Sequence, residues 1–485
     1  MPEMKGRTPV TAGASTLGGA PPESAPASAG RRQRHELFLG EGVPESGTEN
    51  LLVNVGPSHP AMHGIVRILT ELDGEVIVKA DVEIGYLHRA FEKECETGPY
   101  NNCMPYTDRL NYVSPLINNF GFCSAVEKLL GIEPTERCHY IRVIMSEISR
   151  ICDHLTCVGA SAMELGAFTV FLYMIKAREY LWEVIEAVTG ARLTISYGRV
   201  GGLKADLPPE FEGQMRRAFQ ETRTVLAESH KLLTGNRIFV DRMRGVGALG
   251  KDEAIAWAVT GPLLRAAGVP FDVRRATPYW VYDRLDFEIP IGEAGDNYDR
   301  YLVRMEEMEQ SMRIAEQAFT ALPGGPVNVD HEGRPFTPPA EYVDRGKLGK
   351  TGGLLLTDIR LSPNLRGQER PYHARVNAAD RRTVLPAKEN AYGSIEGLMN
   401  HFMLVMDGFG IRPPKGEAYF PVEGANGELG FYVVSDGTDR PYRVRCRPPC
   451  FPPVAALPVM VEGEMIADLV PTFGSVNMIG GELDR

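Results

Sequence analysis

The chain has 485 residues, a length that allows two or three hydrophobic cores. It carries 52 basic and 63 acidic residues, a formal net charge of −11 that argues against nucleic acid or an anionic membrane surface as the main partner. The eight cysteines form no C-x2-C pair and follow no secretory signal, so we expect reduced thiols and no self-contained zinc or iron–sulfur site.

Residues 1–48 are rich in alanine, glycine, serine and proline, as in the stretch TAGASTLGGAPPESAPASAG. Such a composition buries too little apolar surface to offset the entropy of ordering. We therefore predict a disordered tail. A targeting peptide is disfavoured because arginines are not spread along an amphipathic face.

The stretch GPSHPAMHG, residues 56–64, places His59 and His63 four residues apart. On a helix, this spacing would put both imidazoles on one face, where they could bind a metal ion. Pro57 and Pro60 oppose a helix, and a glycine stands at each end, so we predict a turn between two strands. No glutamate lies between the histidines to act as a base, which further disfavours a metal site.

The run from Leu155 to Ile175 is apolar over a length that could cross a bilayer, and Glu164 is its one charged residue before the C-terminal flank. The flanking sequences continue a helical period with well-spaced charges. We therefore predict a buried helix within a bundle rather than a membrane span. The carboxyl group of Glu164 should then be either paired or protonated.

Residues 245–250 read GVGALG and match the glycine pattern of dinucleotide-binding turns. The apolar IFV precedes them, a helical sequence follows, and Asp272 lies near the distance expected of a ribose-binding acid. However, the intervening DRMR is mostly charged, whereas a buried parallel strand should stay apolar up to the glycine. A soluble NAD-dependent dehydrogenase is therefore kept only as an alternative.

Several long motifs together resemble one family. They are NVGPSHPAMHGIVRI, EIGYLHRAFEK, YTDRLNYVSP, GARLTISYGRVGG, VYDRLDFEIPIGEAGDNYDRYLVRMEEMEQS, GELGFYVVSDGTDRPYRVR and the final GELDR. The chain resembles the 49 kDa (D) subunit family of respiratory complex I, the proton-translocating NADH:quinone oxidoreductase, from about residue 50 to 325 and from about residue 376 to 485. In that family the GVG stretch belongs to the core fold, and NADH binds another subunit.

The family is related to the large subunits of nickel–iron hydrogenases, so the resemblance implies an α+β fold of that kind. A central helical bundle is flanked by β-containing N- and C-terminal segments. The implied divisions are a tail (1–48), a β-containing segment with the quinone-site loop (49–130), the bundle (131–325), a divergent insertion (326–375) and a C-terminal α/β segment (376–485). The final LDR is expected to be buried near the former metal-site region.

Hydrogenase activity is excluded, because a nickel–iron site needs four thiolates and this chain has none at the corresponding positions. Those positions are Asn111, Ser114, Ile479 and Glu482. No metal is therefore expected there. In the complex I family, the vacated space is the site of the quinone headgroup.

The resemblance implies that His63 and Tyr112 are the catalytic residues. Reduction of a quinone takes two electrons and two protons, and a phenol and an imidazole can both donate hydrogen bonds to its carbonyl oxygens near neutral pH. Glu164 and Asn111 are expected to lie behind these two residues. His59 is expected to be structural.

Arg89 and Arg109 match family arginines that approach the terminal 4Fe–4S cluster of a partner subunit, and Thr194 lies in a segment near the same cluster. Positive charge there stabilises the reduced cluster. The chain alone is expected to bind no cofactor and to show no turnover. Quinone is the implied substrate, and the 4Fe–4S cluster and FMN are placed on partner subunits.

The implied partners are the iron–sulfur subunit that holds the terminal cluster, the 30 kDa-type subunit and the membrane subunit that forms the quinone channel. The implied location is peripheral, at the cytoplasmic face of the inner cell membrane. Proton translocation would belong to membrane subunits.

Three residues depart from the family pattern. Asn111 and Glu164 stand where aspartate is usual, and Thr194 stands where the family has a histidine coupled to the cluster. Without that imidazole, we expect the potential of the cluster to depend less on pH, and a full slope in titrations at several pH values would reject this. With the insertion 326–375, these changes indicate a divergent branch, in which menaquinone in place of ubiquinone, or a donor other than NADH, remains open.

Overall fold

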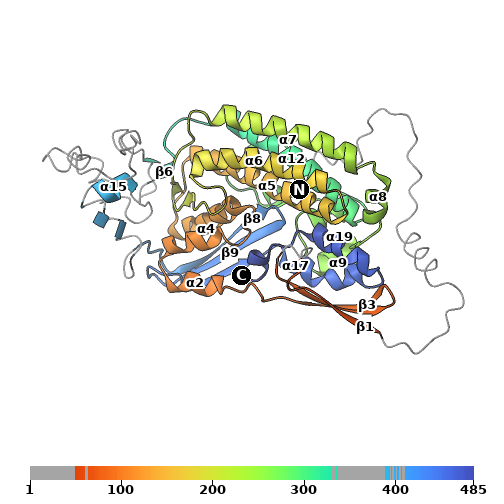
Figure 1. Cartoon of the computed structure of the whole chain (residues 1–485). Helices are drawn as coiled ribbons and strands as arrows, with labels where there is room; N and C mark the ends of the chain where they lie inside the picture. The colour runs from red at the N-terminus through yellow and green to blue at the C-terminus, as the bar shows by residue number, and fades with distance from the viewer. Residues whose placement is uncertain are drawn as a thin grey trace, which may run out of the picture.

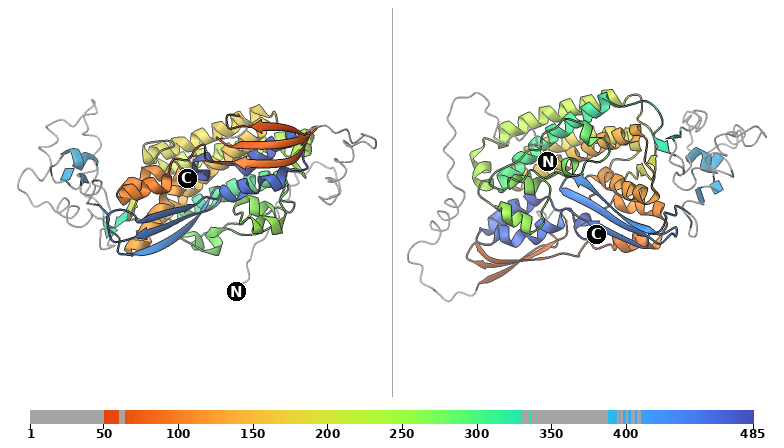
Figure 2. Two further views of the ribbon diagram at one scale, coloured as in Figure 1. Left: turned by 90° about the horizontal axis from the view of Figure 1, so that it is seen from below. Right: turned by 180° about the vertical axis from the view of Figure 1, so that it is seen from behind.

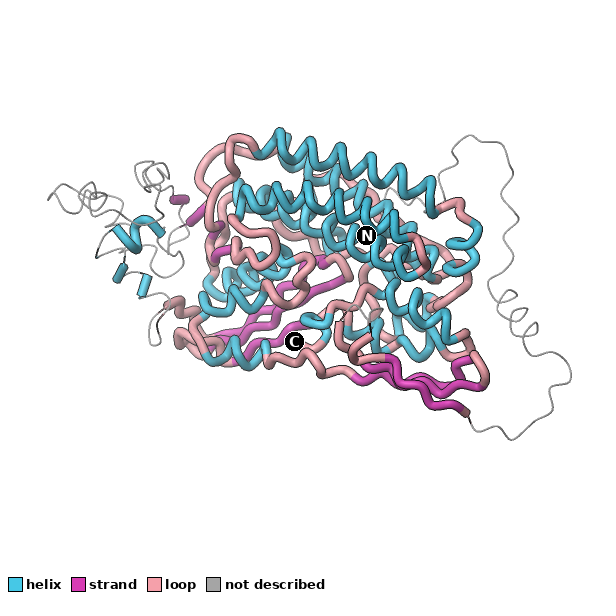
Figure 3. The backbone as a smooth tube through the Cα atoms, viewed as in Figure 1, coloured by secondary structure: helices cyan, strands magenta, loops and turns pink. Residues whose placement is uncertain are grey.

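The computed structural model describes residues 50–59, 64–329, 335–336, 388–393, 395, 398–399, 401–402, 406 and 410–485. His63, the tail 1–48 and most of the insertion 326–375 lie outside the described residues. Long helices are combined with small antiparallel sheets (Figure 3), so the prediction of an α+β fold is confirmed.

A stack of long helices forms the upper part of the molecule as seen in Figure 1. At its centre lies α5, which packs against α4, α6, α12 and α19 and is buried at almost every position from Cys138 to Ala162. The helix begins at Thr135, whose hydroxyl accepts a hydrogen bond from Cys138 N at 3.2 Å. The long helices are α4 (Pro115–Leu130), α5 (Glu136–Glu164), α6 (Phe168–Thr189), α7 (Phe211–Leu233) and α12 (Asn297–Thr320).

The apolar run from Leu155 to Ile175 does not form one buried helix, so that prediction was wrong. The first helix, α5, ends at Glu164, and α6 begins at Phe168. Gly166 between them has a φ of +87°, which favours glycine and reverses the chain. Phe168 is 55% exposed, so the second half of the run is partly a surface. Among the described residues, no helix has the length and hydropathy needed to cross a membrane.

One antiparallel sheet, in the order β10-β9-β8, lies below α4. The approach is close because Gly121 faces the sheet, where an added Cβ would lie 3.0 Å from Val422 Cγ2 and 3.1 Å from Phe431 Cε2. The strands are β8 (Gly416–Gly424), β9 (Gly427–Ser435) and β10 (Arg443–Arg447), and α2 (Phe91–Thr97) packs against β10.

The second antiparallel sheet has the order β1-β2-β3 and joins the two ends of the described chain. Its edge strand β3 contacts the segment before α19, since Ile77 N donates to Glu464 O at 2.9 Å and Gly463 N donates to Ile77 O at 2.7 Å. The segment 56–64, predicted as a turn, follows β1 and precedes β2, and its residues 60–63 lie outside the described residues. The elements here are β1 (Leu51–Val55), β2 (Arg67–Asp73), β3 (Val76–Glu83), α17 (Phe451–Ala455), α18 (Leu457–Val461) and α19 (Ile466–Val476).

The GVGALG turn connects two helices, α8 (Arg237–Met243) and α9 (Lys251–Ala256), so no strand leads into it. This removes the strand–turn–helix context that a dinucleotide site requires. Gly247 has a φ of +61°, and an added Cβ would lie 2.6 Å from Thr472 of α19. The turn is therefore a packing contact inside the fold.

Two hydrophobic cores account for most of the buried apolar residues. The larger one combines the long helices with the sheet β8–β10, and the smaller one combines the sheet β1–β3 with α17–α19 and with α9 and α10. The C-terminus lies between the two sheets (Figure 1), and Figure 2 shows the same arrangement from behind. Leu483 and Asp484 are buried there, as predicted, whereas Arg485 of the final LDR is only partly buried.

The remaining elements are short. They are η2 (Tyr100–Cys103), α3 (Met104–Thr107), β4 (Gly198–Arg199), β5 (Gly202–Leu203), α10 (Pro262–Ala266), α11 (Val273–Ala276), η3 (Tyr282–Arg284), β6 (Asn328–Val329), β7 (Pro335–Phe336), α15 (Lys388–Gly393) and α20 (Gly480–Leu483).

Candidate functional site

Tyr112 lies half-buried in the turn that joins α3 to α4. Asn111 shapes this turn, because its Oδ1 accepts hydrogen bonds from Val113 N (3.1 Å) and Ser114 N (3.2 Å) at the start of α4. Burial raises the pKa of Tyr112, and the nearby Arg89 guanidinium partly opposes the rise. The phenol is therefore protonated at neutral pH and can donate a hydrogen bond.

Asp153 of α5 is fully buried behind this turn and connects it to the C-terminal region. Its Oδ2 accepts hydrogen bonds from Asn111 Nδ2 (2.9 Å) and Ser114 Oγ (2.8 Å). Its Oδ1 accepts one from Asn477 Nδ2 (2.7 Å), just after α19. Three donors offset the lost hydration of this carboxylate.

Glu482 and Cys450 complete the polar cluster. Glu482 Oε1 accepts a hydrogen bond from Cys450 N at 2.9 Å, and the Cys450 thiol contacts Asn477 O at 3.6 Å. Glu482 is 1% exposed and forms no ion pair with any described residue, and burial raises its pKa to about 7. Burial also raises the pKa of the Cys450 thiol well above its usual value. Near neutral pH the thiol is therefore protonated, whereas Glu482 titrates.

Three of the four positions that we expected to correspond to hydrogenase ligands, Asn111, Ser114 and Glu482, thus lie in one region. Asn111 and Ser114 reach Asn477 through Asp153, and Asn477 reaches Glu482 through Cys450. We use the name seam pocket for this group of side chains, whose sequence neighbours belong partly to the larger core (Leu110) and partly to the smaller core (Met478 and Leu483). The group comprises Asn111, Tyr112, Ser114, Asp153, Cys450, Asn477 and Glu482.

The loop that carries His63 resumes at Gly64, although His63 itself lies outside the described residues. A Cβ atom on Gly64 would lie 3.0 Å from Met478 Cε and 3.6 Å from Gly480 N. An added Cβ on Gly480 would in turn lie 3.0 Å from Leu87 Cδ2. The end of the loop is therefore held against the C-terminal segment of the seam pocket.

Arg89 and Arg109 are exposed next to one another at the edge of the seam pocket. Arg89 Nη2 donates to Arg109 O (2.5 Å) and to Gly481 O (3.2 Å). An added Cβ on Gly481 would lie 2.4 Å from Arg109 O, so only glycine allows this approach. Partial burial lowers the pKa of Arg89, the Tyr112 phenol opposes that shift, and the like charge of Arg109 adds to it.

Thr194 is exposed in the turn before β4. Two residues further on, Ser196 donates from its backbone N (2.8 Å) and its Oγ (2.7 Å) to Asp108 Oδ2. These bonds tie the turn that bears Thr194 to the turn that bears Arg109. The structure therefore brings Arg89, Arg109 and Thr194 to one side of the molecule.

Glu164 lies apart from Asn111. It ends α5, eleven residues after Asp153, which corresponds to about 16 Å along a helix axis. The side chain is half-buried and faces α19, where a Cβ on Gly474 would lie 2.3 Å from Glu164 Oε2. Asn111 thus bonds Asp153 in the middle of α5, whereas Glu164 lies at the C-terminal end of that helix.

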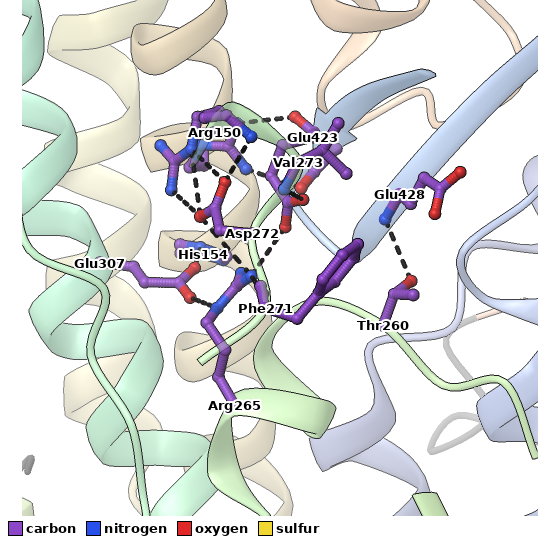
Figure 4. Close-up of polar contacts among 12 residues, drawn as sticks. Arg150, His154, Thr260, Arg265, Phe271, Asp272, Val273, Glu307, Glu423 and Glu428 are labelled. Carbon is purple, nitrogen blue, oxygen red and sulfur yellow. Dashed lines mark hydrogen bonds and ion pairs between the residues drawn. The ribbon is translucent and has the colours of Figure 1, made fainter. Parts of the chain in front are cut away.

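A buried ionic cluster lies on another face of α5 (Figure 4). His154, which follows Asp153 in sequence, contacts Glu307 Oε2 of α12 through Nε2 at 2.8 Å. Glu307 also pairs with Arg265 (2.7 Å), and Arg265 pairs with Glu423 of β8 (2.9 Å). Asp272 joins the cluster through Arg274 at 2.7 Å. All of these side chains are almost completely buried. Two consecutive residues of α5 thus point to different polar clusters, Asp153 to the seam pocket and His154 to the ionic cluster.

Sequence reasoning missed Asp153, Asn477 and Cys450 of the seam pocket. Asp153 interrupts an apolar helical face, which is a signal for a buried polar contact, but the partner of such a residue cannot be read from the helix alone. Among the described residues, no group of three or more His, Cys, Asp or Glu is arranged to hold a metal ion.

Comparison with known proteins identifies the family. The family described as the 49 kDa subunit of the respiratory-chain NADH dehydrogenase matches residues 164–351 and 365–485. The chain belongs to this family. The resemblance drawn from the sequence motifs is thereby confirmed.

Relatives extend the similarity over most of the chain. The D subunit of the NADH-quinone oxidoreductase of Myxococcus xanthus is 49% identical over 438 residues, which cover 90% of this chain and 93% of that protein. The D 1 subunit of Sorangium cellulosum is 49% identical over 439 residues, covering 90% of this chain and 96% of the relative. In Bdellovibrio bacteriovorus the similar protein is a C/D subunit, 46% identical over 90% of this chain and 69% of that protein.

Proposed function

We propose that the chain is the quinone-site core subunit of a proton-translocating NADH:quinone oxidoreductase, and that it passes electrons from a partner-held 4Fe–4S cluster to a quinone. The observation that carries this proposal is the seam pocket. A half-buried phenol stands between two exposed arginines and the buried cluster at Asp153, and the end of the His63 loop is held close by. The relatives named as D subunits of NADH-quinone oxidoreductases support it.

Reduction of a quinone adds two electrons and two protons and yields a quinol. In our proposal, Tyr112 donates a hydrogen bond to one carbonyl oxygen and His63 donates to the other. Asn111 holds the backbone that carries Tyr112 through the bonds to Val113 and Ser114, and thereby fixes where the phenol points. Glu164 would pair with His63 rather than support Tyr112, since Glu164 ends α5 and Asn111 instead bonds Asp153 of that helix.

The exposed face with Arg89 and Arg109 is the side that we assign to the iron–sulfur subunit. Positive charge at this face would favour the reduced form of the partner's 4Fe–4S cluster. FMN would belong to a further subunit, and the chain alone would show no turnover. Thr194 lies on the same side and has no titratable imidazole. The weak pH dependence of the cluster potential therefore stays a prediction.

The remaining partners follow from the same proposal. The 30 kDa-type subunit is supported by the Bdellovibrio C/D protein, which joins a D-like part to additional sequence. A membrane subunit would form the quinone channel and carry out proton translocation, which places this chain peripherally at the cytoplasmic face of the membrane.

The test is Tyr112→Phe in the assembled complex. We expect quinone reduction to fall at least tenfold because a hydrogen-bond and proton donor is lost, while NADH oxidation by an artificial acceptor stays unchanged. His63→Ala should act in the same direction. The matched control is Tyr442→Phe, since Tyr442 is 68% exposed. Unchanged quinone reduction in both site variants would contradict the proposal and leave the chain as a scaffold.

A further inference from the structure

A small cavity lies where α5, α8, α12 and α19 meet, and Cys157 and Ser161 line it one and two turns after Asp153 on α5. It has room for about one water-sized particle. The surface that lines it is largely apolar, and the polar or sulfur-bearing side chains that reach it belong to Cys157, Ser161, Asn297, Tyr301, Arg304 and Ser475.

Two arginines one helical turn apart on α12 bring positive charge to this cavity. Arg300 is 0% and Arg304 is 1% exposed, and neither forms an ion pair with any residue in the described part of the chain. Burial and the neighbouring charge of Arg304 lower the pKa of Arg300 to about 10, with Asp296 opposing the shift. Arg300 therefore still carries a positive charge at neutral pH.

The two guanidinium groups differ in the number of hydrogen bonds that they donate. Arg300 donates to Ser475 Oγ (2.9 Å), Gly247 O (2.7 Å) and Gly295 O (3.0 Å). Arg304 makes one long contact, from Nη1 to Arg300 O at 3.5 Å. Its Nε and Nη2 have no hydrogen-bond partner among the described residues, and neither has the hydroxyl of Ser161 on the opposite wall.

A buried arginine in this state is costly. Unpaired buried charges are strongly disfavoured, and donors buried without acceptors add a penalty of about 1–3 kcal/mol each. Other buried arginines among the described residues form ion pairs with acidic side chains. Arg265 contacts Glu307 and Glu423, and Arg274 contacts Asp272 at 2.7 Å. Arg304 lacks such an ion pair and lines the cavity. A ligand in the cavity is the simplest acceptor for its Nε and Nη2 hydrogens.

The cavity specifies the chemistry of that ligand. Arg304 Nε and Nη2 can only donate and the Ser161 hydroxyl can also donate, which calls for an acceptor, and the two guanidinium groups call for negative charge. A phosphate, sulfate or carboxylate is too large for a space of this size. We propose that the cavity binds one monatomic halide anion, with chloride as the natural ligand, held by Arg304 and Ser161.

The location gives the anion a structural role. Ser475 lies between Arg300 and Asn297, because it receives a bond from Arg300 Nη1 and donates to Asn297 Oδ1 at 2.8 Å. Two residues later, Asn477 holds Asp153 of the seam pocket. A bound halide would therefore fix α19 against α5 and α12 near the point where α19 enters the seam pocket.

The experiment uses the assembled complex exchanged into gluconate and titrated with chloride or bromide. We expect a saturable rise in the thermal midpoint with either halide, and bromide should give an anomalous diffraction peak beside Arg304. Arg304→Met should abolish both signals. Ser161→Ala, which removes one hydroxyl and leaves the charge, should weaken the halide response about tenfold and keep the protein folded.

The matched control is Arg217→Met, since Arg217 lies over the Tyr180 ring on another helix and should leave the halide response unchanged. Absence of a saturable halide response in the wild type would overturn the proposal. So would density in the cavity that does not become anomalous with bromide, because it would identify water. Equal responses in the Ser161→Ala variant and the wild type would also count against this site.

Discussion

Asn111 and Asp153 form the hydrogen bond on which the seam pocket is built. An amide and a carboxylate at 2.9 Å give one donor and one acceptor, whereas two carboxylates at that distance could not both be ionised. The asparagine at position 111 can therefore donate to the acid at position 153. A carboxylate is thus present behind the turn that carries Tyr112, although it comes from α5.

This pairing predicts the outcome of restoring the acid. Asn111→Asp should destabilise the folded chain at pH 7 by about 2–4 kcal/mol, because it removes a donor and places like charges together. The loss should shrink at acid pH, where one carboxyl is protonated. The double variant with Asp153→Asn, which exchanges donor and acceptor, should recover most of the stability in denaturant unfolding. Equal loss in the single and double variants would contradict this account.

Glu482 should make stability depend on pH. Its folded pKa of about 7 lies above the ordinary value of 4.5 because burial disfavours the charged form, so the folded state holds its proton more tightly. Stability should therefore fall as pH rises from about 4.5 to 7, by about 3 kcal/mol, and change no further above that range. Glu482→Gln should abolish this fall in urea unfolding between pH 5 and pH 8. The control is Glu417→Gln, since Glu417 is exposed, and parallel pH curves for the wild type and Glu482→Gln would refute the prediction.

At the scale of elements, the sequence predicted the strand–turn–strand at residues 51–73 well, because prolines and glycines act locally. It failed for the run 155–175, where apolar composition continues through the chain reversal at Gly166. The helix α8 was also missed, since IFV has high strand propensity and its helical state is set by packing. Local signals thus located turns, while tertiary contacts decided the type and the ends of the elements.

The ionic cluster fastens α5 to α12 and gives the next prediction. Burial alone would raise the pKa of Glu307, but Arg265 and His154 hold it well below the ordinary value. Stability from this group should be present at neutral pH and should be lost as pH falls below about 4.5. Glu307→Gln should cost about 3–5 kcal/mol at pH 7, because it leaves Arg265 with a buried charge short of one partner.

The control lies on the same helix. Glu309 pairs with Arg223 at 3.0 Å, but both side chains are partly exposed, so Glu309→Gln should cost at most about 1 kcal/mol in the same unfolding experiment. Similar losses for Glu307→Gln and Glu309→Gln would show that burial does not set the strength of these pairs.

At the scale of the whole molecule, the seam pocket combines segments that are distant in sequence. Motif resemblance predicted Tyr112 and the buried final LDR together with their family. It could not show that Asp153, Asn477 and Cys450 join them, because their contacts span up to 324 residues. Hydrogen bonds of this range leave no periodic trace in a sequence.

Asp484 ties the last segment to the first. Its two carboxylate oxygens accept hydrogen bonds from Gly85 N (2.9 Å) and Leu87 N (2.8 Å), which precede Arg89. Asp484→Ala should therefore loosen the segment 84–90 and lower the thermal midpoint of the chain by several degrees. Hydrogen exchange at the amides of Gly85 and Leu87 should rise most. Unaltered exchange there would show that other contacts hold the segment.

The position of the seam pocket between two hydrophobic cores has a mechanical consequence. Interdigitated apolar side chains resist sliding, because any displacement opens voids. Asn111, Ser114 and Asn477 instead meet Asp153 through polar contacts, which can be exchanged for others at a net cost of about 1 kcal/mol each. We therefore expect a relative displacement of the two cores to occur first at this boundary. Such a displacement would change the surroundings of Tyr112.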